Sequence, residues 1–176
     1  THEIYTLSLH DALPILCVDT TDSTAYVVNY TGQSITSIDI SNTSSLSQLA
    51  TYASSSYLNQ VLNIAIDVAN DVAYCVGASG LTSIDISNRS SLSSLDNVTS
   101  TELATGGAVA LDLTNEIAYV SVRAFDGAIV AVNISNPSNL SISSTFTPTN
   151  FYSAQDISLD VTNEVAYMSS AYSDCI

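Results

Sequence analysis

The chain has 176 residues, of which 46% are hydrophobic, so it can bury a core within one domain. Seventeen acidic residues stand against two arginines, Arg89 and Arg123, and no lysine, which gives a formal net charge of −15. A surface this acidic repels phosphate backbones and anionic lipid headgroups. We therefore expect no nucleic-acid partner and no membrane insertion of this segment.

The first residues do not read as natural protein. Residues 3–15, EIYTLSLHDALPI, match the in-frame translation of a DNA sequencing adapter, so we expect residues 1–15 to be a non-native segment. Both histidines, His2 and His10, fall within it. Without histidine or lysine, the rest of the chain lacks Ser-His and Cys-His dyads, histidine-ligated metals and lysine Schiff bases. Gly106-Gly107 is an isolated pair between repeats and not a phosphate loop. No catalytic, cofactor-binding or metal-binding residue is predicted, and no cofactor.

One pattern recurs four times along residues 16–176, as an Asp placed seven residues before a Tyr. The copies are 48, 45 and 48 residues apart. Self-similarity at this period indicates stacked units that are each too small to bury their own apolar face. The pairs are Asp19/Tyr26, Asp67/Tyr74, Asp112/Tyr119 and Asp160/Tyr167, in repeats of approximately 16–60, 61–106, 107–154 and 155–176.

The second copy shows most clearly which elements a repeat contains. Apolar and polar residues alternate with period two over 64–67, 72–76 and 82–86, with turn residues between these runs. This predicts three antiparallel strands, and a fourth, weaker one follows around 92–98. The other copies predict first strands at 16–19, 109–112 and 157–160, second strands at 24–28, 117–121 and 165–169, and third strands at 37–41 and 131–135.

The second strand of each repeat carries apolar residues on both faces. Tyr74 and Val76 lie on one side, and Ala73 and Cys75 on the other, so each face needs a cover. Four-stranded sheets stacked around an axis provide it, whereas a β-solenoid has shorter rungs without such hairpins. We predict an all-β fold, a partial β-propeller of about three and a half four-stranded antiparallel blades. Because propellers close with four to eight blades, the chain is expected to be a fragment.

The strings Ala73-Tyr74-Cys75-Val76 and 80–88, GLTSIDISN, resemble the core of the LVIVD repeat family of bacterial β-propellers. The proline that follows the asparagine in that family occurs once here, at Pro137. The similarity extends over residues 16–176. The resemblance implies a propeller blade in each repeat and a protein that is mostly exported or surface-associated. It implies no single activity.

Two series of Asp or Asn residues recur at equivalent positions of the repeats. The first, Asp19, Asp67, Asp112 and Asp160, would form a ring in a propeller, where it either binds a cation such as Ca²⁺ or accepts backbone N–H groups in Asx turns. Its position at every turn favours the Asx reading. The second series is Asp39, Asp85 and Asn133. It is expected inside the third strands, with hydrogen bonds across blades or near the rim.

The positions of the tyrosines and cysteines favour packing in the hydrophobic core over a role in a binding site. Tyr26, Tyr74, Tyr119 and Tyr167 recur at one blade position, where core packing is favoured over a sugar-stacking platform. Cys17, Cys75 and Cys175 are an odd number without short spacing, which favours small buried hydrophobes over a disulfide framework.

The sequence predicts a non-catalytic repeat scaffold or binding module of an extracellular or cell-surface bacterial protein. Its partners are a protein or glycan ligand and the remaining blades of its own full-length chain. Loops 29–34, 77–80 and 123–127 are expected to carry specificity. The alternative is a lactonase-like hydrolase whose active-site residues lie in missing blades.

Overall fold

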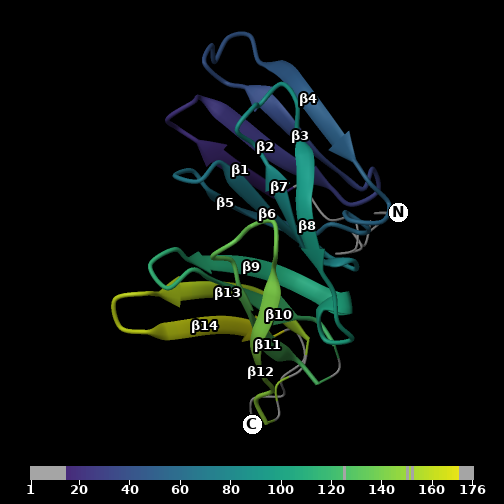
Figure 1. Ribbon diagram of the computed structural model, residues 1–176, viewed down its shortest axis with the longest axis vertical. Helices are drawn as coiled ribbons and strands as arrows, with labels where there is room; N and C mark the ends of the chain where they lie inside the picture. The colour runs from purple at the N-terminus through teal and green to yellow at the C-terminus, as the bar shows by residue number, and fades with distance from the viewer. Residues whose placement is uncertain (1–14, 125, 150, 152, 171–176) are drawn as a thin grey trace, which may run out of the picture.

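The computed structural model describes residues 15–124, 126–149, 151 and 153–170, so the segment 1–14, expected to be non-native, lies outside the described residues. Within these ranges fourteen strands form four antiparallel sheets, beside one 3-10 turn (Figure 1). No helix among them is long and apolar enough to cross a membrane. The prediction of an all-β partial propeller is confirmed.

Each sheet is a blade whose strands pair in chain order. Ile15, expected to be the last residue of the non-native segment, begins the first strand and pairs with Val28. Blade one is β1 (Ile15–Asp19), β2 (Thr24–Asn29), β3 (Ser34–Asp39) and β4 (Ser47–Ala53), and blade two is β5 (Asn63–Asp67), β6 (Val72–Gly77), β7 (Gly80–Asp85) and β8 (Ser93–Val98). Blade three is β9 (Gly106–Asp112), β10 (Ile117–Val122), β11 (Ala128–Asn133) and β12 (Ser141–Phe146), and β13 (Ala154–Asp160) and β14 (Val165–Ser170) belong to blade four.

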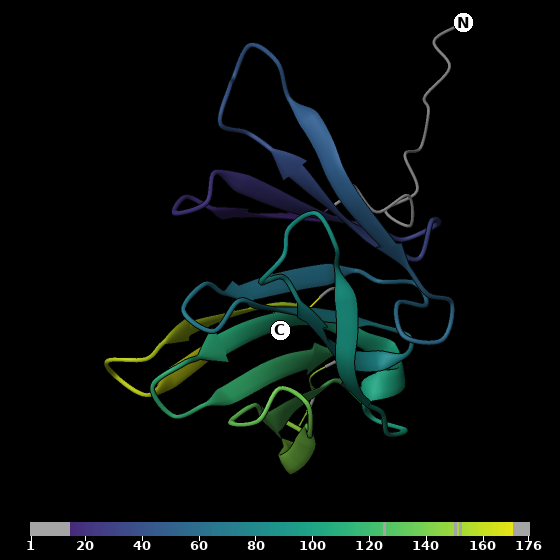
Figure 2. The same ribbon diagram turned by 45° about the horizontal axis from the view of Figure 1, so that its top comes forward.

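The blades stack face to face in sequence order. The first strand of each blade contacts that of the next, from β1 to β5, from β5 to β9 and from β9 to β13. Figure 2 shows the first sheet lying over the second, with the third beneath it. The stacking gives each interior sheet a cover on both sides.

Strand β6 shows why this stacking is needed. Its residues Ala73 and Cys75 belong to a buried cluster shared with blade one, in which Tyr26 is the largest member. Tyr74 and Val76 point the other way, into a cluster shared with blade three. The predicted burial of both faces is confirmed, and these two cores between blades supply the hydrophobic stabilisation.

The third strands end one or two residues earlier than predicted. Oδ1 of Asp39 accepts the N–H of Ser41 at 2.8 Å, Asp85 accepts that of Ser87 at 2.9 Å, and Asn133 that of Ser135 at 2.9 Å. Each Asx turn bends the chain out of the sheet directly after the strand. Of the two arrangements expected for this series, the structure shows bonds at the hairpin end of each blade, where these residues pair with Thr24, Val72 and Ile117, and not bonds across blades. Because an amide oxygen accepts as well as a carboxylate here, Asn133 can replace aspartate.

A serine in the third strand links neighbouring blades instead. Ser37 Oγ donates to the carbonyl oxygen of Arg89 in blade two at 2.5 Å, and Ser83 Oγ donates to that of Pro137 in blade three at 2.6 Å. Each hydroxyl also accepts a backbone N–H from the fourth strand of its own blade, at 3.1 Å, where the register shifts. Each hydroxyl thus bonds a backbone N–H left without its regular partner at the register shift, and it also holds the loop of the next blade against its own blade.

Gly106 and Gly107 begin β9 and do not lie between repeats as expected. A β carbon at Gly106 would collide with the side chain of Val76 in blade two, and one at Gly107 would lie 2.8 Å from the carbonyl oxygen of Ala154 in blade four. Glycine is therefore required here because the first strand of blade three approaches both neighbours closely.

Candidate functional site

The aspartate turns gather at one end of the blades, which we call the hairpin rim. It comprises residues 19–24, 67–72, 112–117 and 160–165, which join the first and second strands of each blade. All four turns lie on the same side of the molecule (left in Figure 1). They carry eight carboxylates, two in each turn.

The first carboxylate of each turn folds the turn itself. Oδ1 of Asp112 accepts the N–H groups of Thr114 and Asn115 at 3.1 and 3.0 Å, and Oδ2 accepts the side-chain amide of Asn115 at 2.8 Å. The Asx reading of the first series is confirmed by the matching bonds at Asp19, Asp67 and Asp160. With both oxygens of Asp112 engaged, that carboxylate is a structural acceptor.

The second carboxylate of the later turns stands on a left-handed residue. Asp71, Glu116 and Glu164 have φ between 56° and 57°, and Ser23 takes the position in blade one with φ 50°. All three acids are exposed. No group of three His, Cys, Asp or Glu side chains that could hold a metal ion occurs in the part of the chain the structure describes. The rim therefore carries exposed second carboxylates beside the first carboxylates of the turns, which are hydrogen-bonded and which we call the inner carboxylates.

Hydrogen bonds lower the pKa of the inner carboxylates. The side-chain amide of Asn115, followed by its backbone N–H, holds the pKa of Asp112 below its ordinary value, and Asn163 does the same for Asp160. Both donors favour the ionised form of the carboxylate. These groups remain negative well into the acid range.

We expect the substitution Asn115→Ala to raise the pKa of Asp112 toward its ordinary value. A carboxylate whose pKa is depressed by folding stabilises the protein above its unfolded pKa, near 3.9, and loses that effect as pH falls through the folded pKa. The variant should therefore lose this stabilisation at a higher pH. Carbon-13 NMR titration of the Asp112 carboxyl and acid unfolding followed by circular dichroism would measure both effects. Asn139→Ala, at an exposed turn asparagine, is the control, and identical titrations in the two variants would contradict the assignment.

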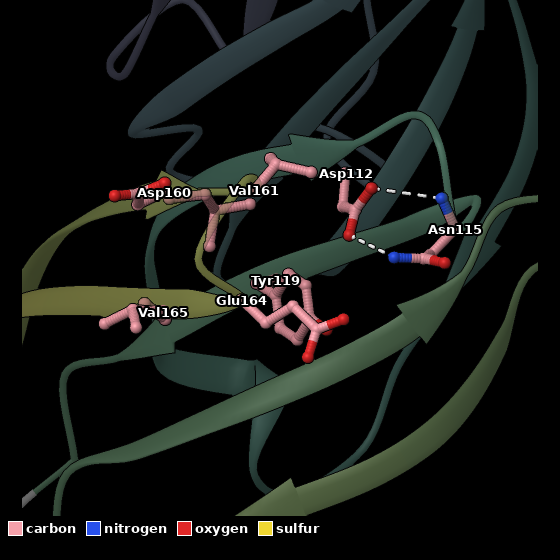
Figure 3. Close-up of a pocket in the computed structure, with 9 residues that line it drawn as sticks. Asp112, Asn115, Tyr119, Asp160, Val161, Glu164 and Val165 are labelled. Carbon is pink, nitrogen blue, oxygen red and sulfur yellow. Dashed lines mark hydrogen bonds between the residues drawn. The ribbon is translucent and has the colours of Figure 1, made fainter.

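Cavities open at the rim between consecutive blades. Between blades three and four lies one of about 300 Å³, to which blade three contributes Asp112, Asn115 and Tyr119 (Figure 3). Blade four contributes Asp160 and Glu164, among others. Figure 3 shows the dashed hydrogen bonds that hold the Asp112 carboxylate against Asn115. The cavity thus combines carboxylates with the partly exposed ring of Tyr119.

A second cavity, of about 290 Å³, lies between blades two and three, and we call it the second cleft. It has carboxylates from both blades on its sides and an apolar portion contributed by blade three. The lining residues are Asp67, Asn70, Leu113, Glu116, Ile134, Ser135 and Pro137.

The corresponding position between blades one and two, which we call the first cleft, holds a side chain of the protein itself. The guanidinium of Arg89, from the loop after β7, donates to the carbonyl oxygen of Asp22 and, at 3.1 Å, to Oγ1 of Thr24. Sequence reasoning missed this role and treated Arg89 only as one of two bases. The sequence feature that could have indicated this role is the alignment of the repeats, in which Arg89 of blade two is equivalent to Pro137 of blade three.

Charges around the first cleft change the pKa of the neighbouring core tyrosine, Tyr26. Burial, together with the negative charges of Asp19, Asp22 and Asp71, raises the pKa of Tyr26 to about 12, while the charge of Arg89 opposes the shift. At Tyr26 the guanidinium therefore partly offsets the negative field of three aspartates of the rim. Because two cations face so many acids in this chain, Arg89 is a locally important neutralising charge.

The core role predicted for tyrosine and cysteine is confirmed for Tyr26, Tyr74 and Cys75, whereas Tyr119 is only half-buried. Tyr26 and Tyr74 are 1% exposed, whereas Tyr167 on β14 is 61% exposed. Cys75 is buried, and the half-buried Cys17 thiol donates to the carbonyl oxygen of Ile64 at 3.1 Å. Burial raises the pKa of both thiols. Cys175 lies outside the described residues.

The loops expected to carry specificity differ from one another. Loop 77–80 is buried or half-buried because the linker before β5 covers it, with Asn59 bonded to both Ala78 and Ser79. That loop is not the exposed surface that was expected. Loop 29–34 is exposed at Asn29, Thr31 and Gly32, and loop 123–127 contains Phe125, which lies outside the described residues.

Comparison with known proteins agrees with this architecture. The LVIVD repeat profile matches residues 25–54, 65–100 and 107–147, and no curated protein sequence matches the chain. Among solved structures, a candidate 6-phosphogluconolactonase from Bacteroides uniformis has a TM-score of 0.74 at 10% identity, over 89% of this chain and 48% of that one. A Lactobacillus plantarum protein gives 0.75 at 12%, over 88% and 49%, and a nidogen/laminin complex gives 0.66 at 13%, over 90% and 56%. The chain thus spans about half the length of these structures, and such low identities show the fold alone.

Proposed function

We propose, because this chain belongs to the LVIVD repeat family, that it is part of a non-catalytic propeller that binds a partner protein through its hairpin rim. The observation that carries the proposal is the repetition of carboxylate-lined cavities between blades at this one end. We place the protein at the cell surface or outside the cell of a bacterium. The acidic surface, rich in Ser and Thr, suits that setting.

The charge of the rim favours a basic partner. Exposed acids at Asp22, Asp71, Glu116 and Glu164 create a negative field along one edge of the molecule. Such a field steers oppositely charged partners and rejects acidic ones, with an effect that weakens as salt screens it. Binding through the rim is therefore expected to depend on ionic strength.

The alternative remains a lactonase-like hydrolase, which the fold of the Bacteroides uniformis protein favours. The inner carboxylates described here are poor general bases, since turn donors occupy their oxygens and lower the pKa of Asp112 and Asp160. In this alternative the reacting groups would come from blades other than those described.

The test presents the whole chain, immobilised for surface plasmon resonance, with peptides of graded charge and separately with a glycan array. We expect basic peptides to bind, and their affinity to fall with added salt and in the double variant Glu116→Gln/Glu164→Gln. The control Glu102→Gln/Asp126→Asn removes the same charge from two exposed acids at the opposite end of blade three. Glycan binding without peptide binding would refute a protein partner. Hydrolysis of 6-phosphogluconolactone by the chain would favour the enzyme.

A further inference from the structure

Two residues occupy one backbone position in successive blades. The carbonyl oxygen of Arg89 accepts Ser37 Oγ from blade one, and that of Pro137 accepts Ser83 Oγ from blade two. The loop after the third strand is thus held against the preceding blade in the same way in both places. Only the side chains differ, so the first and second clefts can be compared position by position.

The first cleft shows which chemical group this place in the fold receives. There the Arg89 guanidinium donates to the carbonyl oxygen of Asp22 and to Oγ1 of Thr24. At Tyr26 its positive charge opposes the negative charges of Asp19, Asp22 and Asp71. This observation is independent of the acids in the second cleft. The cation is the Arg89 guanidinium, which is bound at the equivalent position between blades one and two.

The second cleft retains part of that environment and lacks the cation. Asn70 stands at the position of Asp22, and Glu116 at that of Asp71, while Val72 replaces Thr24 and removes one hydroxyl acceptor. Pro137 brings a short ring in place of the long arginine side chain, and a cavity of about 290 Å³ lies beside it. The backbone position whose carbonyl accepts Arg89, a carboxylate on Glu116 and space for a guanidinium are therefore present, whereas the hydroxyl acceptor is not.

We infer that the second cleft binds the guanidinium of an arginine side chain supplied by a partner protein. Glu116 gives a carboxylate for its planar N–H groups, which suit carboxylate geometry better than an ammonium does. Leu113, Ile134 and Pro137 provide apolar surface for its methylene groups. The inference rests on the proposed function and specifies the partner's contacting residue.

The test follows backbone amide signals of the whole nitrogen-15-labelled chain by NMR during titration with the peptide acetyl-Gly-Arg-Gly-amide. Saturable shifts are expected at Asn70, Leu113 and Glu116, with a Kd of about 1 mM, as suits one side chain. Glu116→Gln should weaken binding about tenfold, the effect of losing a hydrogen bond to a charged group. Pro137→Arg should place the chain's own guanidinium in the cleft and abolish the shifts there. Pro137→Ala is its control and should keep them.

Three outcomes would overturn the inference. They are the absence of shifts around the second cleft, unchanged binding in Pro137→Arg, and equal affinity for acetyl-Gly-Lys-Gly-amide. If Pro137→Arg fails to fold, the Glu116→Gln titration and the map of shifts in the unmodified chain decide the question. Loss of the arginine site alone, with rim-dependent binding of basic peptides intact, would leave the proposed function standing. Absence of both would refute the two together.

Discussion

Replacing Tyr74 by alanine is expected to lower the free energy of unfolding by about 3–5 kcal/mol, the usual cost of deleting a large aromatic side chain from a core. Tyr74 is 1% exposed and packs with Val76, Val120 and Val122 between blades two and three. The interior of a protein is densely packed, so these neighbours cannot fill the space by small movements. Urea unfolding followed by circular dichroism would measure the loss.

Tyr167→Ala is a matched control, because the residue holds the same place in the repeat. Tyr167 is 61% exposed, so its truncation should change the free energy of unfolding by less than about 0.5 kcal/mol. Equal losses in the two variants would show that the recurring tyrosine stabilises each blade by itself. Burial between blades would then not be the source of its effect.

Much of the fold was predictable because the signals that specify it are local and repeated. The alternation at Ala73, Tyr74, Cys75 and Val76 requires two covered faces, and the structure covers both with neighbouring blades. The weak fourth strand predicted around 92–98 is β8, Ser93–Val98. Strand ends were less predictable, because Asp39 belongs to an alternating pattern and yet also caps a turn. An alternating pattern alone does not tell whether an aspartate continues a strand or ends it.

The candidate site was predictable only in part, for a different reason. The Asx turns follow from the position of Asp67 and Asp112 at each hairpin, which is a local feature. The role of Arg89 depends on a contact with Asp22, 67 residues earlier, between blades. Ser37 and Ser83 likewise bond residues more than 50 positions away. Comparing repeats position by position would have paired Arg89 with Pro137. Only the stacked blades show that a cavity lies beside Pro137 where the arginine side chain would be.

Gly80→Ala is expected to destabilise the protein by at least about 1–3 kcal/mol, the cost of holding a side chain at an unfavourable backbone angle. Gly80 has φ +93°, and it pairs with Gly77 across a two-residue hairpin between β6 and β7. A β carbon there would also collide with the carbonyl oxygen of Val98 on β8. Relieving that overlap would separate β7 from β8, so the measured loss should exceed the strain alone.

Gly32→Ala provides the comparison, since that glycine also lies in the hairpin between the second and third strands of its blade. Its φ is not positive, and the nearest atoms to an added β carbon belong to the Asn29 side chain, which can move. The change there should stay within about 0.5 kcal/mol. Urea unfolding of both variants separates the two cases. If Gly80→Ala were as stable as Gly32→Ala, β7 and β8 would have to separate without cost. Their shared ladder, in which the buried Leu81 of β7 pairs with Val98 of β8, argues against that.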